Sequence, residues 1–421
     1  MGLQAVTKAG AAPALRATAV ALGMALAGLA VADDAAPPPA WSLRGFGTVG
    51  LAHADHAGAV YTSSIVKAHG VGQDTRWSSA LDSRIGGQLT VKIAPRWTAL
   101  LQVIGEQRLE HGVTPVVEWA NVKYQASPEL SLRVGRIALP LFLAADYRQI
   151  GYTYPWARPP VEIYGALTLT NSDGVDATYR WQQNGFKHVT QAYFGRTVMR
   201  TPATRIEASQ LAGIANTVEY GAASARISLL STRLTADAGR PVFDALRSFG
   251  AQGSALAEYL ALENKRTRAV SFGASYDPGN WFVMGELGRL RSRSFVGATS
   301  SMYASAGYRV GDFTPYVSYA RVRADSAGTA ARLDLAGLPP AAGAQGALVN
   351  GALGEVFATI PIQHTTSIGA RWDFATNFAF KLQLDRVEPT GGSNGTFLYL
   401  RPGLHAGRTV HVASAVLDFV F

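Results

Sequence analysis

Apolar and polar side chains alternate with a period of two along most of the sequence, in blocks of about ten residues. In the block 83–94 the apolar and the polar side chains fall on opposite faces, namely Ile85, Leu89, Val91 and Ile93 on one face and Arg84, Gln88, Thr90 and Lys92 on the other. A tilted strand of this length crosses a bilayer with one face toward lipid and the other toward water. A soluble β-sandwich shows the same period, so the number of blocks and the segments between them carry the argument.

The recurring blocks predict sixteen strands, at 41–53, 83–94, 97–108, 116–125, 130–139, 173–181, 187–196, 214–221, 225–236, 267–276, 281–293, 301–310, 313–324, 363–374, 378–388 and 408–421. Seven connections between them are short and mostly rich in turn formers, as in Asp277-Pro278-Gly279-Asn280. Eight are long, at 54–82, 109–115, 140–172, 197–213, 237–266, 294–300, 325–362 and 389–407. An even number of strands with both termini on the short-turn side indicates an all-β, antiparallel transmembrane β-barrel.

Two long loops differ from the rest in composition. Residues 237–266 carry apolar side chains at largely helical spacing, which predicts one or two short helices there. Residues 325–362 are rich in Ala, Gly and Pro, and we expect a mobile segment.

The first thirty-two residues have the features of a cleaved export signal. Lys8 and Arg16 give a basic start, residues 17–29 an apolar run, and Ala30-Val31-Ala32 a small-x-small cleavage site. An anchoring helix is the alternative, but the run is short and is closely followed by prolines. We therefore expect a signal peptide at 1–32, a short linker at 33–40 and the barrel at 41–421.

Composition and charge narrow the class of protein. The chain has no cysteine, so an exported protein would hold together without disulfides, and no run after residue 32 approaches eighteen apolar residues. It has 44 Gly, 16 Tyr, 17 Phe and 8 Trp but only 16% charged residues, which suits a wall that is apolar and aromatic outside. The formal net charge of +9 falls to +7 without Lys8 and Arg16. Export argues against a nucleic-acid partner, so we expect attraction to outer-membrane lipid and lipopolysaccharide, or an anion-favouring pore.

Aromatic residues gather at the predicted short-turn ends of the strands, at Trp41, Trp97, Tyr124, Trp181, Trp281, Phe313, Trp372 and Phe378. This spacing predicts an interfacial girdle; the alternative is a chance set of strand aromatics. The last strand ends in Phe421 and must pair with the first, because an open edge in lipid leaves backbone groups unsatisfied.

With these features in place, residues 41–421 resemble the Gram-negative general porin superfamily, whose members are trimers of sixteen-stranded barrels. The resemblance implies an outer-membrane location, a homotrimer and passive diffusion of small hydrophilic solutes. It also implies that Phe421 is the signal read by the barrel insertion machinery. A second likeness, to porins of undefined substrate, covers the stretch from Gly135-Arg136-Ile137-Ala138-Leu139-Pro140 to Gly151-Tyr152-Thr153-Tyr154-Pro155-Trp156 and Ile163-Tyr164.

That stretch falls in the loop 140–172, which the resemblance places inside the barrel as a constriction. General porins carry an acidic loop tip, whereas this loop mixes both charges with aromatic residues, and its candidate site residues are Asp146, Tyr147, Arg148, Tyr154, Arg158 and Glu162. An aromatic and arginine-rich constriction would suit a solute that bears a carboxylate or a ring.

Strand parity adds basic side chains on the lumen face, among which we single out Arg44, Arg84, Lys92 and Arg133. Rings of basic groups concentrate anions without a tight site. The alternative is that these charges pair with lumen carboxylates and only keep the bore wet. A register slip of one residue would turn each of them to lipid.

The histidines show no persuasive metal-ligand spacing, and there is no phosphate loop or nucleophile elbow, so we expect no metal, no cofactor and no catalysed reaction. Three hypotheses stay open: a general diffusion porin that leans to anions, a channel specific for organic or aromatic carboxylates, and a surface adhesin or outer-membrane lipase built on the same barrel.

Overall fold

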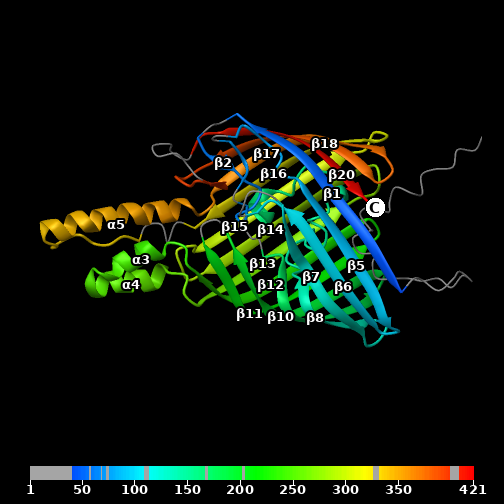
Figure 1. Ribbon diagram of the computed structural model, residues 1–421, viewed down its shortest axis with the longest axis horizontal. Coiled ribbons are helices and arrows are strands. Elements are labelled where there is room, and N and C mark those ends of the chain that lie inside the picture. The colour runs from blue at the N-terminus through cyan, green and yellow to red at the C-terminus, as the bar shows by residue number, and fades with distance from the viewer. Residues whose placement is uncertain are drawn as a thin grey trace, which may run out of the picture.

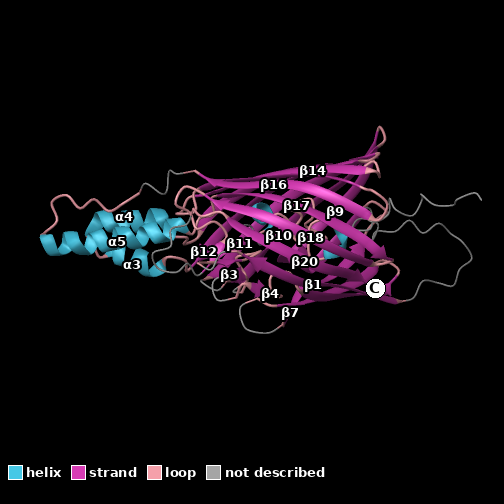
Figure 2. Ribbon diagram, turned by 90° about the horizontal axis from the view of Figure 1, so that it is seen from above, coloured by secondary structure: helices cyan, strands magenta, loops and turns pink. Residues whose placement is uncertain are grey.

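The computed structural model describes residues 40–55, 58–67, 69–72, 75–108, 113–165, 169–201, 204–325, 331–398 and 407–421. The expected signal peptide at 1–32 and all but the last residue of the linker lie outside the described residues. The described chain forms a barrel of antiparallel strands, and a group of helices projects from the end opposite the C-terminus (Figures 1 and 2).

The strands of the wall follow one another around the barrel in chain order. The sixteen long strands in the described part of the chain are β1 (Trp41–Ala54), β5 (Arg84–Ala94), β6 (Trp97–Glu106), β7 (Thr114–Gln125), β8 (Leu130–Ala138), β9 (Asn171–Gln183), β10 (Phe186–Arg200), β11 (Arg205–Tyr220), β12 (Ala223–Ala236), β13 (Lys265–Tyr276), β14 (Trp281–Ser292), β15 (Ala298–Tyr308), β16 (Phe313–Ala324), β17 (Gln363–Ala375), β18 (Phe378–Pro389) and β20 (Val410–Val420). The sixteen-stranded antiparallel barrel expected from alternation is confirmed.

Short strands from the loops complete the sheet structure. β4 (Trp77–Ser78) comes from the first long loop and pairs with β1. β2 (Val60–Tyr61), β3 (Val71–Gly72) and β19 (Phe397–Leu398) form a separate three-stranded sheet.

The barrel closes between the first and the last strand. β1 pairs with β5 on one side and with β20 on the other, from Phe46 opposite Val420 to Ala54 opposite Val412. Phe421 adds two backbone hydrogen bonds with Gly45, of 2.8 and 2.9 Å. Closure leaves neither strand with an open edge in the bilayer.

The two faces of the wall differ as the alternation predicts. On β1, Leu43, Val49 and Leu51 point outward and are exposed, whereas Thr48 between them is buried toward the lumen. At the short-turn end, the rings of Trp97 and Tyr124 lie 4.7 Å apart, and those of Phe313 and Trp372 stack at 5.5 Å. The turn Asn184-Gly185 has positive φ at both residues (50° and 82°), as a two-residue hairpin requires.

One predicted loop is wrong. The expected loop 197–213 is mostly strand, because β10 and β11 extend as a long hairpin whose pairing continues to Arg200 opposite Arg205. The pairing between them shifts register between Gly195 and Thr197, and Gln210 has a φ of 47°. Such bulges interrupt the strict alternation of apolar and polar side chains, so the sequence pattern did not predict these parts of the two strands.

Three helices rise from the long-loop end: α3 (Arg240–Arg247), α4 (Gly250–Leu260) and α5 (Pro340–Ala358). They pack around Leu246, Leu260 and Leu353, which are fully buried. α3 and α4 lie within 237–266, whereas α5 replaces much of the mobile segment expected at 325–362. In the described part of the chain, no helix is both long and apolar enough to cross a membrane.

Candidate functional site

The loop between β8 and β9 turns into the barrel. This segment, called loop 3 below, is described at 139–165 and 169–170, and it contains η1 (Gly151–Thr153) and α2 (Val161–Tyr164). Three cationic side chains of the wall donate to its carbonyl oxygens: Arg226 to Phe142 (2.6 Å), Arg371 to Tyr152 (2.6 Å), and Lys381 to Gly151 (2.7 Å) and Trp156 (2.9 Å). Loop 3 is therefore fixed to β12, β17 and β18.

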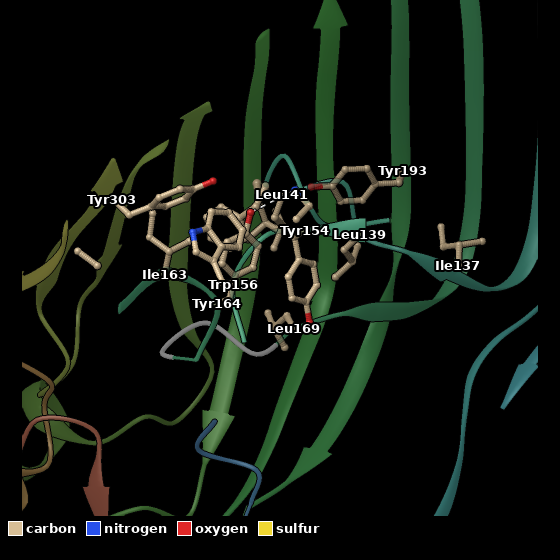
Figure 3. Close-up of a cluster of buried hydrophobic side chains, with 14 of the residues drawn as sticks. Ile137, Leu139, Leu141, Tyr154, Trp156, Ile163, Tyr164, Leu169, Tyr193 and Tyr303 are labelled. Carbon is tan, nitrogen blue, oxygen red and sulfur yellow. Dashed lines mark hydrogen bonds between the residues drawn. The ribbon is translucent and has the colours of Figure 1, made fainter. Parts of the chain in front are cut away.

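Aromatic side chains fill the space between loop 3 and the same side of the wall (Figure 3). Trp156 donates from Nε1 to Ser305 Oγ on β15 at 3.0 Å, and its ring meets Tyr303 edge-on. The hydroxyl groups of Tyr164 and Tyr303 both donate to Glu286 on β14, which also accepts the Leu143 backbone N–H. Trp156, Tyr164, Tyr303 and Glu286 thus have hydrogen-bond partners for their buried polar groups.

Arg158 anchors the far half of loop 3. Its guanidinium donates to both oxygens of Asp82 at 2.9 and 2.7 Å, to Asp385 at 2.6 Å and to Ser414. Burial raises the pKa of the Asp82 carboxyl, but the charge and hydrogen bonds of Arg158 outweigh burial and hold that pKa below its usual value. Arg158, only 4% exposed, therefore serves as a structural cation between the first long loop, loop 3 and the wall.

Two other predicted loop residues are also buried. Tyr154 accepts a hydrogen bond from Arg84 at 2.8 Å; burial raises the pKa of its hydroxyl to about 12, although Arg84 opposes the shift. Glu162 accepts hydrogen bonds from Gln363 (2.7 Å) and Thr365, and burial raises the pKa of its carboxyl. Tyr154 and Glu162 hold the loop against the wall and have little exposure to the lumen.

A cavity of about 370 Å³ opens where loop 3 is not pressed against the wall, beside β6, β7 and β10. Among the described residues, its lining includes seven cationic side chains and two acidic ones: Lys67, Arg84, Arg108, Arg136, Arg148, Arg158 and Arg200, with Asp82 and Glu106. Two of these cations share one carboxylate, since Lys67 lies 3.3 Å from Glu106 and Arg108 lies 2.7 Å from it.

Arg148 differs from these paired cations. It lies on loop 3 and lines the cavity, and no hydrogen bond or ion pair holds its guanidinium among the residues that the structure describes. Burial lowers the pKa of Arg148, and the nearby carboxylate of Glu118 opposes the shift. Because a guanidinium stays charged across the physiological range, Arg148 presents to the passage a positive charge that no carboxylate contacts directly among the described residues.

The remaining predicted residues lie apart from the cavity. Arg44 and Lys92 face the lumen at the short-turn end and are exposed. Arg133 is paired with Asp176 at 2.9 Å, and Asp146 with Arg226 at 3.0 Å. Tyr147 packs at the edge of the aromatic cluster. Of the predicted site residues, the structure brings Arg84, Arg148 and Arg158 together at the cavity.

Sequence reasoning missed several lining residues. Lys67 and Asp82 lie in the first long loop. Arg108 lies just beyond the end of β6, and Arg200 is the last residue of β10. At such positions the alternation of side chains does not predict which face of the wall a residue takes. Asp82 could have been considered from the sequence, because it directly precedes the clearly alternating block 83–94.

No protein-family model and no curated protein matches the sequence. Among solved structures, the chain is similar to the outer membrane channel DcaP of Acinetobacter baumannii (TM-score 0.54, 8% identity, covering 90% of this chain and 97% of that one). It is also similar to the anion-selective porin from Comamonas acidovorans (TM-score 0.53, 15% identity, 90% and 99% covered). A third is OmpT, an outer membrane protein of Vibrio cholerae folded in vitro (TM-score 0.50, 10% identity, 92% and 100% covered).

At these identities the likeness concerns the fold. Each match spans nearly the whole of both chains, so it covers the complete barrel and not a single hairpin. The chain has the fold of the Gram-negative outer-membrane porins.

Proposed function

We propose that this protein is an outer-membrane porin, a water-filled channel through which small hydrophilic solutes diffuse passively, with a preference for anions. The closed barrel and the loop inside it support this function, and no catalysed reaction is part of the proposal. Solute flux would follow the size of the passage and the fixed charges around it.

The free guanidinium of Arg148 beside the cavity is the observation that carries the anion preference. Most other cations near loop 3 have carboxylate partners, so they add little net field. A cleft with one excess sign of charge raises the local concentration of the opposite ion.

The reversal potential of the channel in a planar bilayer under a salt gradient tests this proposal. The parent channel should prefer chloride over potassium, Arg148→Gln should weaken the preference, and Arg148→Glu should weaken it further or invert it. Arg386→Gln is the matched control, because Arg386 lies on the outer face of β18 and already pairs with Glu388 at 2.8 Å. A cation-selective parent, or equal potentials in all variants, would refute the anion preference.

A channel specific for organic or aromatic carboxylates is the second candidate. Arg148 shares the cavity with Gln149 and Tyr164, so a cation, an amide and an aromatic ring line one space. Such a set suits a ring that bears a carboxylate. Benzoate at micromolar concentration should then block conductance in the parent and not in Arg148→Gln, whereas a general porin would show no block in either.

Assembly and membrane insertion are also proposals. We propose a homotrimer; the solved structures with this fold include a trimer form of OmpT from Vibrio cholerae. We propose that Phe421, whose ring is 69% exposed beside Phe419, is the residue that the insertion machinery reads. A barrel that conducts no ions in a bilayer would favour the adhesin or lipase alternatives.

A further inference from the structure

Arginine side chains gather on the outer face of the wall, at the long-loop ends of neighbouring strands. They point to the same side of the wall as the exposed apolar residues of their own strands, as Arg268 does with Val270 and Phe272 on β13. The set is Arg233 on β12, Arg266 and Arg268 on β13, Arg289 and Arg291 on β14, and Arg321 and Arg323 on β16. We call these seven residues the outer arginine cluster.

Strand register places members of the cluster side by side. Arg289 on β14 and Arg323 on β16 both pair with Ser300 on β15, so the three residues form one row across the strands. Arg268 pairs directly with Arg291 in the next row. Adjacent strands lie about 4.8 Å apart, so the backbones at Arg289 and Arg323 are separated by about 10 Å across a small serine. Two long guanidinium side chains can converge over such a gap.

Most members of the cluster lack a counter-charge from the protein. Among the described residues, no hydrogen bond or ion pair holds the guanidinium groups of Arg266, Arg268, Arg291, Arg321 and Arg323, whereas Arg289 lies 3.2 Å from Asp325 and Arg233 donates to Gln210. Arg386 on the outer face of β18, by contrast, lies 2.8 Å from Glu388. The outer arginine cluster therefore leaves its positive charge to be balanced by groups outside the chain.

An apolar groove of about 420 Å³ lies beside these arginines, since Val270 shares a row with Arg289 and Arg323, and Leu287 and Met302 share a row with Arg321. Its outward-facing lining comes from Val270, Phe272, Leu287 and Met302, and Arg289, Arg321 and Arg323 border it. The small residues of β15 form its floor, between the bulkier side chains of β14 and β16. A hydrocarbon chain fits such a groove.

The height of the cluster matches a headgroup layer. Arg289 lies eight residues along β14 from Trp281, which is at the short-turn end. Eight residues span about 26 Å of strand, or about 20 Å across the bilayer at a barrel tilt of about 40°. The apolar band of such barrels is about 25 Å tall, so the backbone at Arg289 lies about 5 Å short of the opposite headgroups, a gap that an extended arginine side chain spans.

From this geometry we propose that the outer arginine cluster and the groove beside it bind a phosphorylated lipid of the outer leaflet, of the lipid A type. Arg321 and Arg323 hold the phosphate, because a guanidinium matches phosphate oxygens with two parallel hydrogen bonds. One acyl chain lies along β15 against Val270, Leu287 and Met302. The site lies outside the pore, and its occupation does not require solute transport.

Retention of defined lipids by the full-length protein in detergent, measured by native mass spectrometry, tests this site. The parent should retain lipid A about tenfold more strongly than phosphatidylethanolamine or dephosphorylated lipid A, and inorganic phosphate at equal concentration should not displace it. Arg321→Gln with Arg323→Gln should lower lipid A retention by about the same factor. Heat-modifiable gel mobility and open-channel conductance of each variant establish that it is folded.

A matched control removes two arginines from the long-loop ends that already have carboxylate partners. This variant, Arg205→Gln with Arg386→Gln, should retain lipid A as the parent does, because Glu207 and Glu388 partner these side chains at 3.9 and 2.8 Å. Equal retention of phosphorylated and dephosphorylated lipid by the parent, displacement by inorganic phosphate, or equal losses in test and control variants would overturn the proposal. A protein that binds lipid A but conducts no ions would refute the proposed channel and leave this site standing.

Discussion

Replacing Arg158 by glutamine should release the second half of loop 3 while the barrel stays closed. The substitution leaves Asp82 and Asp385 as two buried carboxylates that no longer share a cation. Removing one partner of a buried ion pair costs about 3–5 kcal/mol, because the remaining charge stays desolvated. The wall is held by continuous strand pairing, whereas loop 3 is held by side-chain contacts, so displacement of the loop relieves the strain at the lowest cost.

Single-channel recording measures this release. Arg158→Gln should give a larger and noisier conductance than the parent, and adding Asp82→Asn and Asp385→Asn should restore a quiet channel, because no unpaired charge then remains buried. Arg133→Gln is the matched control: it breaks a pair with Asp176 within the wall, at 2.9 Å, and leaves loop 3 in place. An Arg158→Gln channel that conducts like the parent would show that this ion cluster does not hold the loop.

Strong acid should release loop 3 as Arg158→Gln does. The pKa of Asp82 lies below its ordinary value in the folded protein, so its ion pair contributes stability above about pH 4. That contribution is lost as the pH falls through the lowered pKa. Conductance noise in the parent should therefore rise only in strong acid, and it should be independent of pH in the Arg158→Gln variant with both aspartates replaced.

Two further substitutions test the other contacts of loop 3. Burial raises the pKa of the Glu162 carboxyl, so the folded protein is favoured at low pH and loses stability as the pH rises through that pKa. Glu162→Gln should therefore raise the unfolding temperature at pH 8 and leave it unchanged at pH 4. A side chain at Gly151 would collide with the Asp418 carboxylate and the Thr48 hydroxyl, so Gly151→Val should displace η1 and raise conductance, which bilayer recording measures.

The sequence predicts the wall well because strand parity is a local property. Each of the sixteen strands overlaps a block of alternating residues, and the bilayer enforces that alternation at every crossing. The long hairpin of β10 and β11 escaped prediction where bulges shift the parity, near Thr197 and Gln210. α5 escaped because its many alanines and glycines give no clear apolar stripe.

The site is less accessible to sequence reasoning, because its contacts join distant parts of the chain. Arg158 meets Asp82 and Asp385, which are 76 and 227 positions away. Parity identifies a lumen arginine, but it cannot show whether a carboxylate from another strand or loop neutralises it. The outer arginine cluster did leave a signal, since an Arg-x-Arg pattern recurs at 266–268, 289–291 and 321–323.

Because carboxylates pair with most cations of the lumen, the anion preference of the channel should depend on salt concentration. Arg133, Arg158 and Lys381 each pair with a carboxylate, so the field in the cavity depends on the few free cations, above all Arg148. A cavity of about 370 Å³ is roughly 7 Å across, if its shape is taken as a cube. The Debye length is about 10 Å at 0.1 M salt and about 3 Å at 1 M, so the charge of Arg148 spans the cavity only in dilute salt.

Anion preference should accordingly fall between 0.1 M and 1 M mean salt in the parent channel, and Arg148→Gln should show a small preference at both concentrations. Reversal potentials at a fixed concentration ratio measure this effect without a change in the driving gradient. A preference that persists in 1 M salt would mean that anions are held by direct contact with their binding groups, because contact survives screening that removes a long-range field. In that case the carboxylate-specific channel, and not the general porin, would explain the arginines of the lumen.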